Sequence, residues 1–145
     1  MLSKNLTEKQ KEIVLYVFFG VLTTIVAWVS YYFFRWVFIG FGIDGTTIPV
    51  ILHWIVAVTF AYFTNRKWVF QSKENRAAGI FREMFMFYAG RLFTLGVMTV
   101  LMYLLIDMTG RSGGLYELLV FGFVNAVVLV LNYVISKLFV FRKGK

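Results

Sequence analysis

The chain has 145 residues, of which 60% are hydrophobic, 20% aromatic and only 15% charged, and its mean hydropathy is +0.76. A soluble domain carries about 25% charged residues, so this composition excludes an ordinary soluble enzyme and a disordered chain. The chain contains no cysteine, which excludes disulfides and thiolate metal sites. The composition therefore predicts a small integral membrane protein, with a single domain over residues 1–145.

Four apolar runs are long enough to cross a bilayer, for which a helix needs about 20 residues. Three of these runs contain no charged residue, and the third in chain order contains only Arg91. Because the runs lack the strict alternation of a membrane barrel, we predict an all-α polytopic fold. The predicted transmembrane helices cover about residues 13–37, 47–68, 82–106 and 115–138.

Basic residues are concentrated before the first span, between the second and third spans, and after the fourth. Lysine and arginine outnumber aspartate and glutamate by 15 to 7, which gives a net charge of +8. The positive-inside rule therefore predicts that both termini and the central loop are cytoplasmic, and it explains the charge without a nucleic-acid partner. The residues are Lys4, Lys9, Lys11, Arg66, Lys67, Lys73, Arg76, Arg82, Lys137, Arg142, Lys143 and Lys145.

Two stretches 71 residues apart share a polar residue, a basic residue and an aromatic-Val-Phe step near the end of a span. The paired positions are Tyr62 and Tyr133, Asn65 and Ser136, Arg66 and Lys137, and the steps at 68–70 and 139–141. The starts of the first and third spans are also alike, at residues 17–20 and 87–90. Because two spans per copy preserve orientation, we predict two parallel two-helix repeats related by an axis along the membrane normal.

Arg91 is the one charge inside an apolar run. An arginine there costs at least ~2.5 kcal/mol on insertion scales, so it usually faces the bundle and has a partner. Glu83, Asp107 and Glu117 are poorly placed for that role, whereas a planar guanidinium suits the oxygens of a phosphate. We therefore expect Arg91 to bind an anionic lipid headgroup, with snorkelling to the interface as the alternative.

The other polar residues divide between helix packing and ligand binding. The repeated basic and aromatic stretches anchor helices at headgroup depth or form the mouth of a lipid-phosphate site, and the two roles are compatible. Asn125 and Asn132 share one face of the fourth span, where helix contact and ligand binding are equal alternatives. His53, the single histidine, cannot form a zinc site alone. With no catalytic constellation or cofactor motif, we expect neither an enzyme nor a bound cofactor or metal.

Together these motifs resemble the GtrA-like family, small four-helix membrane proteins of cell-surface polysaccharide synthesis. The resemblance rests on the Asn-Arg-Lys-Trp-Val-Phe step at 65–70, the arginine at 91 and the Ser-Lys-Leu-Phe-Val-Phe-Arg step at 136–142, and it extends over about residues 11–142. It implies that the chain flips an undecaprenyl- or other polyprenyl-phosphate-linked monosaccharide from the cytoplasmic to the outer leaflet. The sugar then serves to glycosylate teichoic acid or another envelope polysaccharide, and the protein lies in a bacterial inner or plasma membrane.

For this substrate, the residue chemistry and the resemblance suggest three groups of site residues. The lipid phosphate is expected to bind Arg91, Arg66, Lys137 and Asn65. The sugar and its groove are expected to involve Asn125, Asn132, Trp68 and Tyr62. Val69 and Phe70 belong to the same interface motif. Small residues recur on one face of the first, second and fourth spans, as at Gly20, Ala57 and Gly122. The expected partners are therefore the lipid-linked sugar, the membrane and further copies of the chain.

Two other functions compete with the flippase hypothesis. The chain could instead be a non-catalytic membrane anchor or activator of a polyprenyl-phosphate glycosyltransferase, which the basic cytoplasmic face would suit. A small multidrug exporter also has four short helices, but it depends on a carboxylate within the membrane. Here the embedded charge is Arg91, which disfavours that function.

Overall fold

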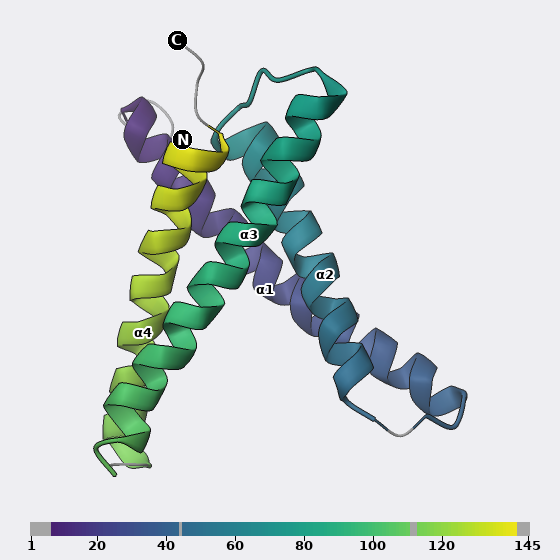
Figure 1. The fold of residues 1–145 in the computed structure, drawn as a ribbon, viewed down its shortest axis with the longest axis vertical. Coiled ribbons are helices and arrows are strands. Elements are labelled where there is room, and N and C mark those ends of the chain that lie inside the picture. Colours follow the sequence, from purple (N-terminus) through teal and green to yellow (C-terminus); the bar gives the residue numbers. More distant parts are fainter. Residues whose placement is uncertain (1–6, 44, 111–112, 142–145) are drawn as a thin grey trace, which may run out of the picture. The chain divides into compact units, whose positions relative to one another are not determined.

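The computed structural model describes residues 7–43, 45–110 and 113–141. These residues form helices and turns without any strand, which confirms the all-α prediction. Within the described ranges, four helices are long and apolar enough to cross a membrane. The chain divides between Lys73 and Glu74 into two compact units, the first and the second hairpin (Figure 1). Four residues used for the orientation, Lys4, Arg142, Lys143 and Lys145, lie outside the described ranges.

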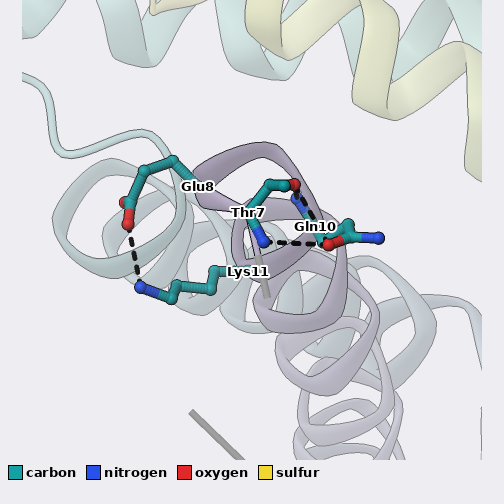
Figure 2. Close-up of polar contacts among 4 residues, drawn as sticks. All are labelled: Thr7, Glu8, Gln10 and Lys11. Atoms are coloured by element: carbon teal, nitrogen blue, oxygen red, sulfur yellow. Dashed lines mark hydrogen bonds and ion pairs between the residues drawn. The ribbon is translucent and has the colours of Figure 1, made fainter. Parts of the chain in front are cut away.

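The first helix, α1 (Glu8–Gly40), begins at a capping box (Figure 2). Thr7 Oγ1 accepts a hydrogen bond from the Gln10 N–H at 3.3 Å, and Gln10 Oε1 accepts one from the Thr7 N–H at 2.8 Å. The box satisfies N–H groups that have no partner within the first turn. An exposed ion pair between Lys11 and Glu8, at 2.8 Å, adds little. The helix therefore begins in the polar segment that precedes the apolar run.

α1 ends in a Schellman motif that reverses the chain. The Ile43 N–H donates to the Phe38 carbonyl at 3.0 Å, and the Gly42 N–H donates to the Ile39 carbonyl at 2.9 Å. Gly42 has a φ of 74°, a left-handed conformation that glycine adopts without steric cost. The glycine-rich loop of the sequence is therefore a helix cap with satisfied carbonyl groups.

The second helix, α2 (Thr47–Thr64), packs against α1 within the first hairpin (Figure 1). Arg35 Nη1 donates to the Gly45 carbonyl at 3.2 Å. The rings of Tyr31 and His53 meet edge to face with their centroids 5.6 Å apart. The first contact connects α1 to the turn, and the second connects α1 to α2.

α2 continues into a π-helical segment, η1 (Asn65–Val69). Its hydrogen bonds span five residues, because the Phe70 N–H donates to the first carbonyl of the segment at 2.8 Å. The Ser72 N–H then donates to the Arg66 carbonyl at 2.9 Å, across Gln71, whose φ is 48°. The end of the first hairpin is thus a tight reversal closed by backbone hydrogen bonds.

The second hairpin consists of two long helices, each ending in a π-helical segment. Its elements are α3 (Ala77–Met102), η2 (Tyr103–Asp107), α4 (Gly114–Ile135) and η3 (Ser136–Val140). Near the turn, Ile106, Val120 and Val124 form a buried apolar cluster. Tyr116 Oη donates to the Leu105 carbonyl at 2.7 Å beside this cluster. The hydrogen bond connects α4 to η2.

Farther from the turn, α3 and α4 are connected by a polar pair and a close approach. Thr94 Oγ1 donates to Asn132 Oδ1 at 2.9 Å, and this bond is buried. At Gly90 the helices come so close that an added Cβ would lie 2.9 Å from Ile135 Cγ2. Small residues and interhelical hydrogen bonds are the means by which helices associate in lipid.

Two structural features recur 71 residues apart, the separation found in the sequence at the ends of the second and fourth spans. The π-helical segments η1 and η3 have this separation. So do two tilted ring pairs: Tyr16 and Phe70 at 6.3 Å and 54°, and Phe87 and Phe141 at 6.0 Å and 53°. The ring pairs align Tyr16 with Phe87, a separation of 71 residues. The sequence comparison of 17–20 with 87–90 uses a separation of 70, so the two alignments differ by one residue. How the two copies are arranged in the membrane remains a prediction.

The close approach at Gly90 predicts that a larger side chain there destabilises the second hairpin. Gly90→Val should lower the melting temperature in detergent, because overpacking typically costs about 1–3 kcal/mol. Gly20→Val is the matched control, since a Cβ at Gly20 meets no atom within 4 Å. Adding Ile135→Ala to Gly90→Val should recover part of the loss. The melting temperatures are measured by circular dichroism. Equal melting temperatures for Gly90→Val and Gly20→Val would contradict this packing.

The orientation can be tested directly because the chain has no cysteine. A membrane-impermeant maleimide should label a Gly45→Cys variant in intact cells, since this loop is predicted to face outward. It should label a Lys73→Cys variant only after the membrane is permeabilised. The reverse labelling pattern would overturn the predicted topology.

Candidate functional site

An open pocket of about 440 Å³ lies at the end of the first hairpin. Its lining residues are Phe63, Arg66, Lys67, Trp68, Gln71 and Ser72, and we call it the basic pocket. These residues bring two cations, hydrogen-bonding groups and aromatic surface into one place. Such a combination suits an anion that is attached to a polar group.

Trp68 is held in this pocket by two ring contacts. It stacks on Phe19 of α1, with centroids 5.3 Å apart and ring planes 21° apart. Lys67 Nζ lies 4.8 Å from the Trp68 ring centroid, a cation–π contact. The indole is still 45% exposed, so part of its surface remains available to a ligand. Trp68 therefore offers aromatic surface that is already ordered before binding.

The backbone at Gln71 is strained in a way that shapes the pocket. Its φ of 48° lies in the left-handed region, which costs roughly 1–2 kcal/mol for a residue with a Cβ. Glycine would adopt this conformation without that cost. Gln71 lines the basic pocket, so this left-handed residue forms part of the pocket wall.

The remaining residues of the 65–70 step and Tyr62 lie inside the protein. Tyr62 is completely buried, with its ring edge to face with Phe63 at 5.3 Å, so it presents no exposed face for a sugar. Asn65, Val69 and Phe70 are 3%, 5% and 6% exposed. The structure thus brings Arg66 and Trp68 into the basic pocket and places the other motif residues in the protein interior.

Arg91 lies within α3, and its guanidinium is positioned over the Phe87 ring, with Cζ 4.8 Å from the centroid. Within the described ranges, that guanidinium has no hydrogen-bond or ion-pair partner. A cation–π contact contributes about 0.5–2 kcal/mol, which is less than the ~2.5 kcal/mol that inserting an arginine costs. Arg91 therefore keeps its N–H donors available for an anion from outside the described chain.

Three further predicted residues lie in the second hairpin. Lys137 Nζ donates to Tyr133 Oη at 3.0 Å and lies 5.3 Å from the centroid of that ring. Asn132 is 8% exposed and makes the hydrogen bond with Thr94. Asn125 is exposed, and its Nδ2 donates to the Phe121 carbonyl at 2.7 Å. Asn132 thus serves helix packing, whereas Asn125 remains accessible.

Four contributors lie outside the set of site residues predicted from the sequence. Lys67 is predicted only as a cation that sets the orientation, although its place beside Arg66 is a signal for binding as well. Gln71 and Ser72 gave no signal, because the chain reversal brings them back to the pocket. Thr94 lies one helical turn after Arg91, and its bond to Asn132 depends on how two helices pack.

The chain is similar to one protein family and to several bacterial membrane proteins. A family model described as the GtrA/DPMS transmembrane domain matches residues 15–141. The Bacillus subtilis membrane protein YwcD is 34% identical over 131 residues, which is 90% of this chain and 97% of YwcD. Cell wall teichoic acid glycosylation proteins named GtcA, from Listeria monocytogenes and Listeria innocua, are 32% and 33% identical, over 96% of this chain and 90% of each relative. No solved structure matches the chain.

The family model covers most of the chain, and the relatives match over nearly their whole length. With four helices able to span a membrane in the described ranges and with bacterial relatives, this is a multi-pass bacterial membrane protein. The resemblance seen in the sequence is therefore confirmed, and the chain belongs to the GtrA/DPMS transmembrane domain family.

Proposed function

We propose that the protein moves a polyprenyl-phosphate-linked monosaccharide from the cytoplasmic leaflet to the outer leaflet, for glycosylation of teichoic acid or another envelope polysaccharide. One observation carries the proposal: Arg91 lies within an apolar helix, and its guanidinium has no anionic partner in the described ranges. The phosphodiester of such a lipid is an anion that reaches this depth with its own apolar tail. Family membership and the teichoic acid glycosylation for which the GtcA relatives are named support the same substrate class.

The basic pocket is proposed as the first binding site of the headgroup. Removing a charged phosphodiester and a polar sugar from water is costly unless both are paired. Arg66 and Lys67 supply charge for the phosphate, and the exposed part of Trp68 supplies a face for the sugar. The positive-inside rule predicts that this pocket opens to the cytoplasm, where the lipid-linked sugar is made in the proposed function.

The second hairpin is proposed to supply contacts of its own to the headgroup. Arg91 and Lys137 are the cations assigned to the phosphate there, and Arg91 can bind two phosphate oxygens at once. Asn125, exposed on α4, is assigned to sugar hydroxyl groups. None of the four apolar runs contains a carboxylate for ion coupling. Transport therefore follows the gradient set by synthesis on one side and consumption on the other.

Translocation in liposomes tests this function, with a polyprenyl phosphodiester of glucose as the probe. Arg91→Ala should slow translocation about tenfold or more, because it removes the charge that pairs with the phosphate. Arg91→Lys should translocate the lipid at a rate between those of the wild-type protein and Arg91→Ala, since lysine keeps the charge but loses the bidentate geometry. Lys73→Ala, a loop cation outside the site, is the matched control. Normal translocation by the Arg91→Ala protein would overturn the mechanism.

A second candidate is a non-catalytic anchor or activator of a polyprenyl-phosphate glycosyltransferase. The observation that favours it is the openness of the basic pocket at the end of the first hairpin, where a partner protein also finds access. Deletion of the chain distinguishes the two functions. Normal synthesis of the sugar lipid with loss of surface glycosylation supports translocation, whereas loss of synthesis itself, measured in membrane extracts, supports the activator.

A further inference from the structure

Asn65 has an unusual buried atom. Among the described residues, its Oδ1 is the only buried side-chain oxygen or nitrogen without a hydrogen-bond partner. The residue is 3% exposed and lies at the junction of α2 and η1, next to Arg66 of the basic pocket. Buried polar atoms are nearly always paired, so an unpaired one calls for a physical explanation.

The orientation of the Asn65 amide is determined by its neighbours. Asn65 Nδ2 donates to the Ala61 carbonyl at 2.7 Å. The same carbonyl accepts hydrogen bonds from the Asn65 backbone N–H and from Thr64 Oγ1. A carbonyl oxygen cannot donate, so turning the amide over would bring two oxygens together. The unpaired atom of Asn65 is therefore an acceptor, and its partner must be a donor.

Folding alone gives no reason for an amide at this position. Leaving an acceptor buried and unpaired costs about 1–3 kcal/mol, whereas an apolar side chain of similar shape would be nearly neutral. The amide therefore carries a stability cost in the ligand-free protein. A ligand that donates a hydrogen bond to Oδ1 removes that cost when it binds.

The chemistry of the proposed substrate identifies the donor. The phosphate of a phosphodiester offers only acceptor oxygens, so it cannot supply a hydrogen bond to Oδ1. The hydroxyl groups of the attached sugar can donate. We propose that Asn65 Oδ1 accepts a hydrogen bond from a sugar hydroxyl while the neighbouring cations hold the phosphate, so that Asn65 distinguishes sugar-loaded lipid from lipid without a sugar. This role refines the expectation that Asn65 binds the phosphate, and it rests on the proposed function.

Access to this atom requires movement. Oδ1 is covered in the ligand-free structure, so a hydroxyl reaches it only when the side chains above it move aside. A headgroup without a hydroxyl gains nothing from that movement, because the acceptor would stay unpaired. Selection therefore occurs at the step in which a hydroxyl group displaces these side chains and reaches Oδ1.

Binding of two lipids of equal charge tests the proposal. The probes are a polyprenyl phosphodiester of glucose and a polyprenyl methyl phosphodiester, which has the same single charge but no hydroxyl group. The full chain in detergent should prefer the glucosyl lipid over the methyl lipid by at least about five- to tenfold, the effect of one hydrogen bond. In Asn65→Leu this preference should fall by about five- to tenfold, to what Trp68 and the other sugar contacts supply, while binding of the methyl lipid stays unchanged. Asn65→Ser should keep part of the preference, because a hydroxyl still accepts.

Asn132→Leu provides the matched control for stability. Asn132 Oδ1 already accepts a hydrogen bond from Thr94 Oγ1, so the loss of this hydrogen bond in Asn132→Leu should lower the melting temperature. Asn65→Leu should leave the melting temperature unchanged or raise it. An unaltered lipid preference in Asn65→Leu, or a fall in melting temperature as large as that of Asn132→Leu, would overturn the inference.

The wild-type chain separates failure of this inference from failure of the proposed function. If it binds neither lipid, the proposed function itself is wrong. If it binds both lipids equally well, the headgroup site recognises only phosphate. In that case the role of Asn65 fails and the proposed substrate class survives.

Discussion

The structure depends on one constraint, which is that hydrocarbon offers no hydrogen-bond partners to the backbone. Each long apolar run is helical because a helix satisfies its own N–H and C=O groups. The ends of the helices need other partners, and the chain supplies them locally. Thr7 and Gln10 cap the start of α1, Gly42 closes its end in a Schellman motif, and η1 ends with hydrogen bonds that span five and six residues.

The same environment changes what holds the helices together. Lipid tails are as apolar as leucine, so burying apolar side chains gives little net attraction between helices. Large apolar residues accordingly stay on the surface, as with Trp28 at 69% and Trp36 at 74% exposed. In water, surface of this kind would cause aggregation. The second hairpin instead relies on the close approach at Gly90 and on the buried bond between Thr94 and Asn132.

Unpaired polar groups are costly in such a protein, and two of them lie where the proposed function needs them. The Arg91 guanidinium requires an anion, and the Asn65 Oδ1 requires a donor. A sugar attached through a phosphodiester to a lipid offers both groups in one headgroup. Its apolar tail stays in the bilayer while the head crosses. The basic pocket then binds the headgroup first, at the membrane surface. Its cations are Arg66 and Lys67, and its aromatic surface is the indole of Trp68.

The sequence by itself determined the fold class, since uncharged runs of about 20 residues have few alternatives to transmembrane helices. It also singled out Arg91 and the step at 65–70, because a charge or a polar motif is conspicuous against an apolar background. The tertiary structure decided which members of that step line a pocket and which are buried, as the exposure of Trp68 and the burial of Tyr62 show. It also decided which amide atom of Asn65 lacks a hydrogen-bond partner. Such distinctions depend on hydrogen-bond directions and on contacts between residues distant in the chain. The pattern of apolar residues in the sequence predicts neither of these.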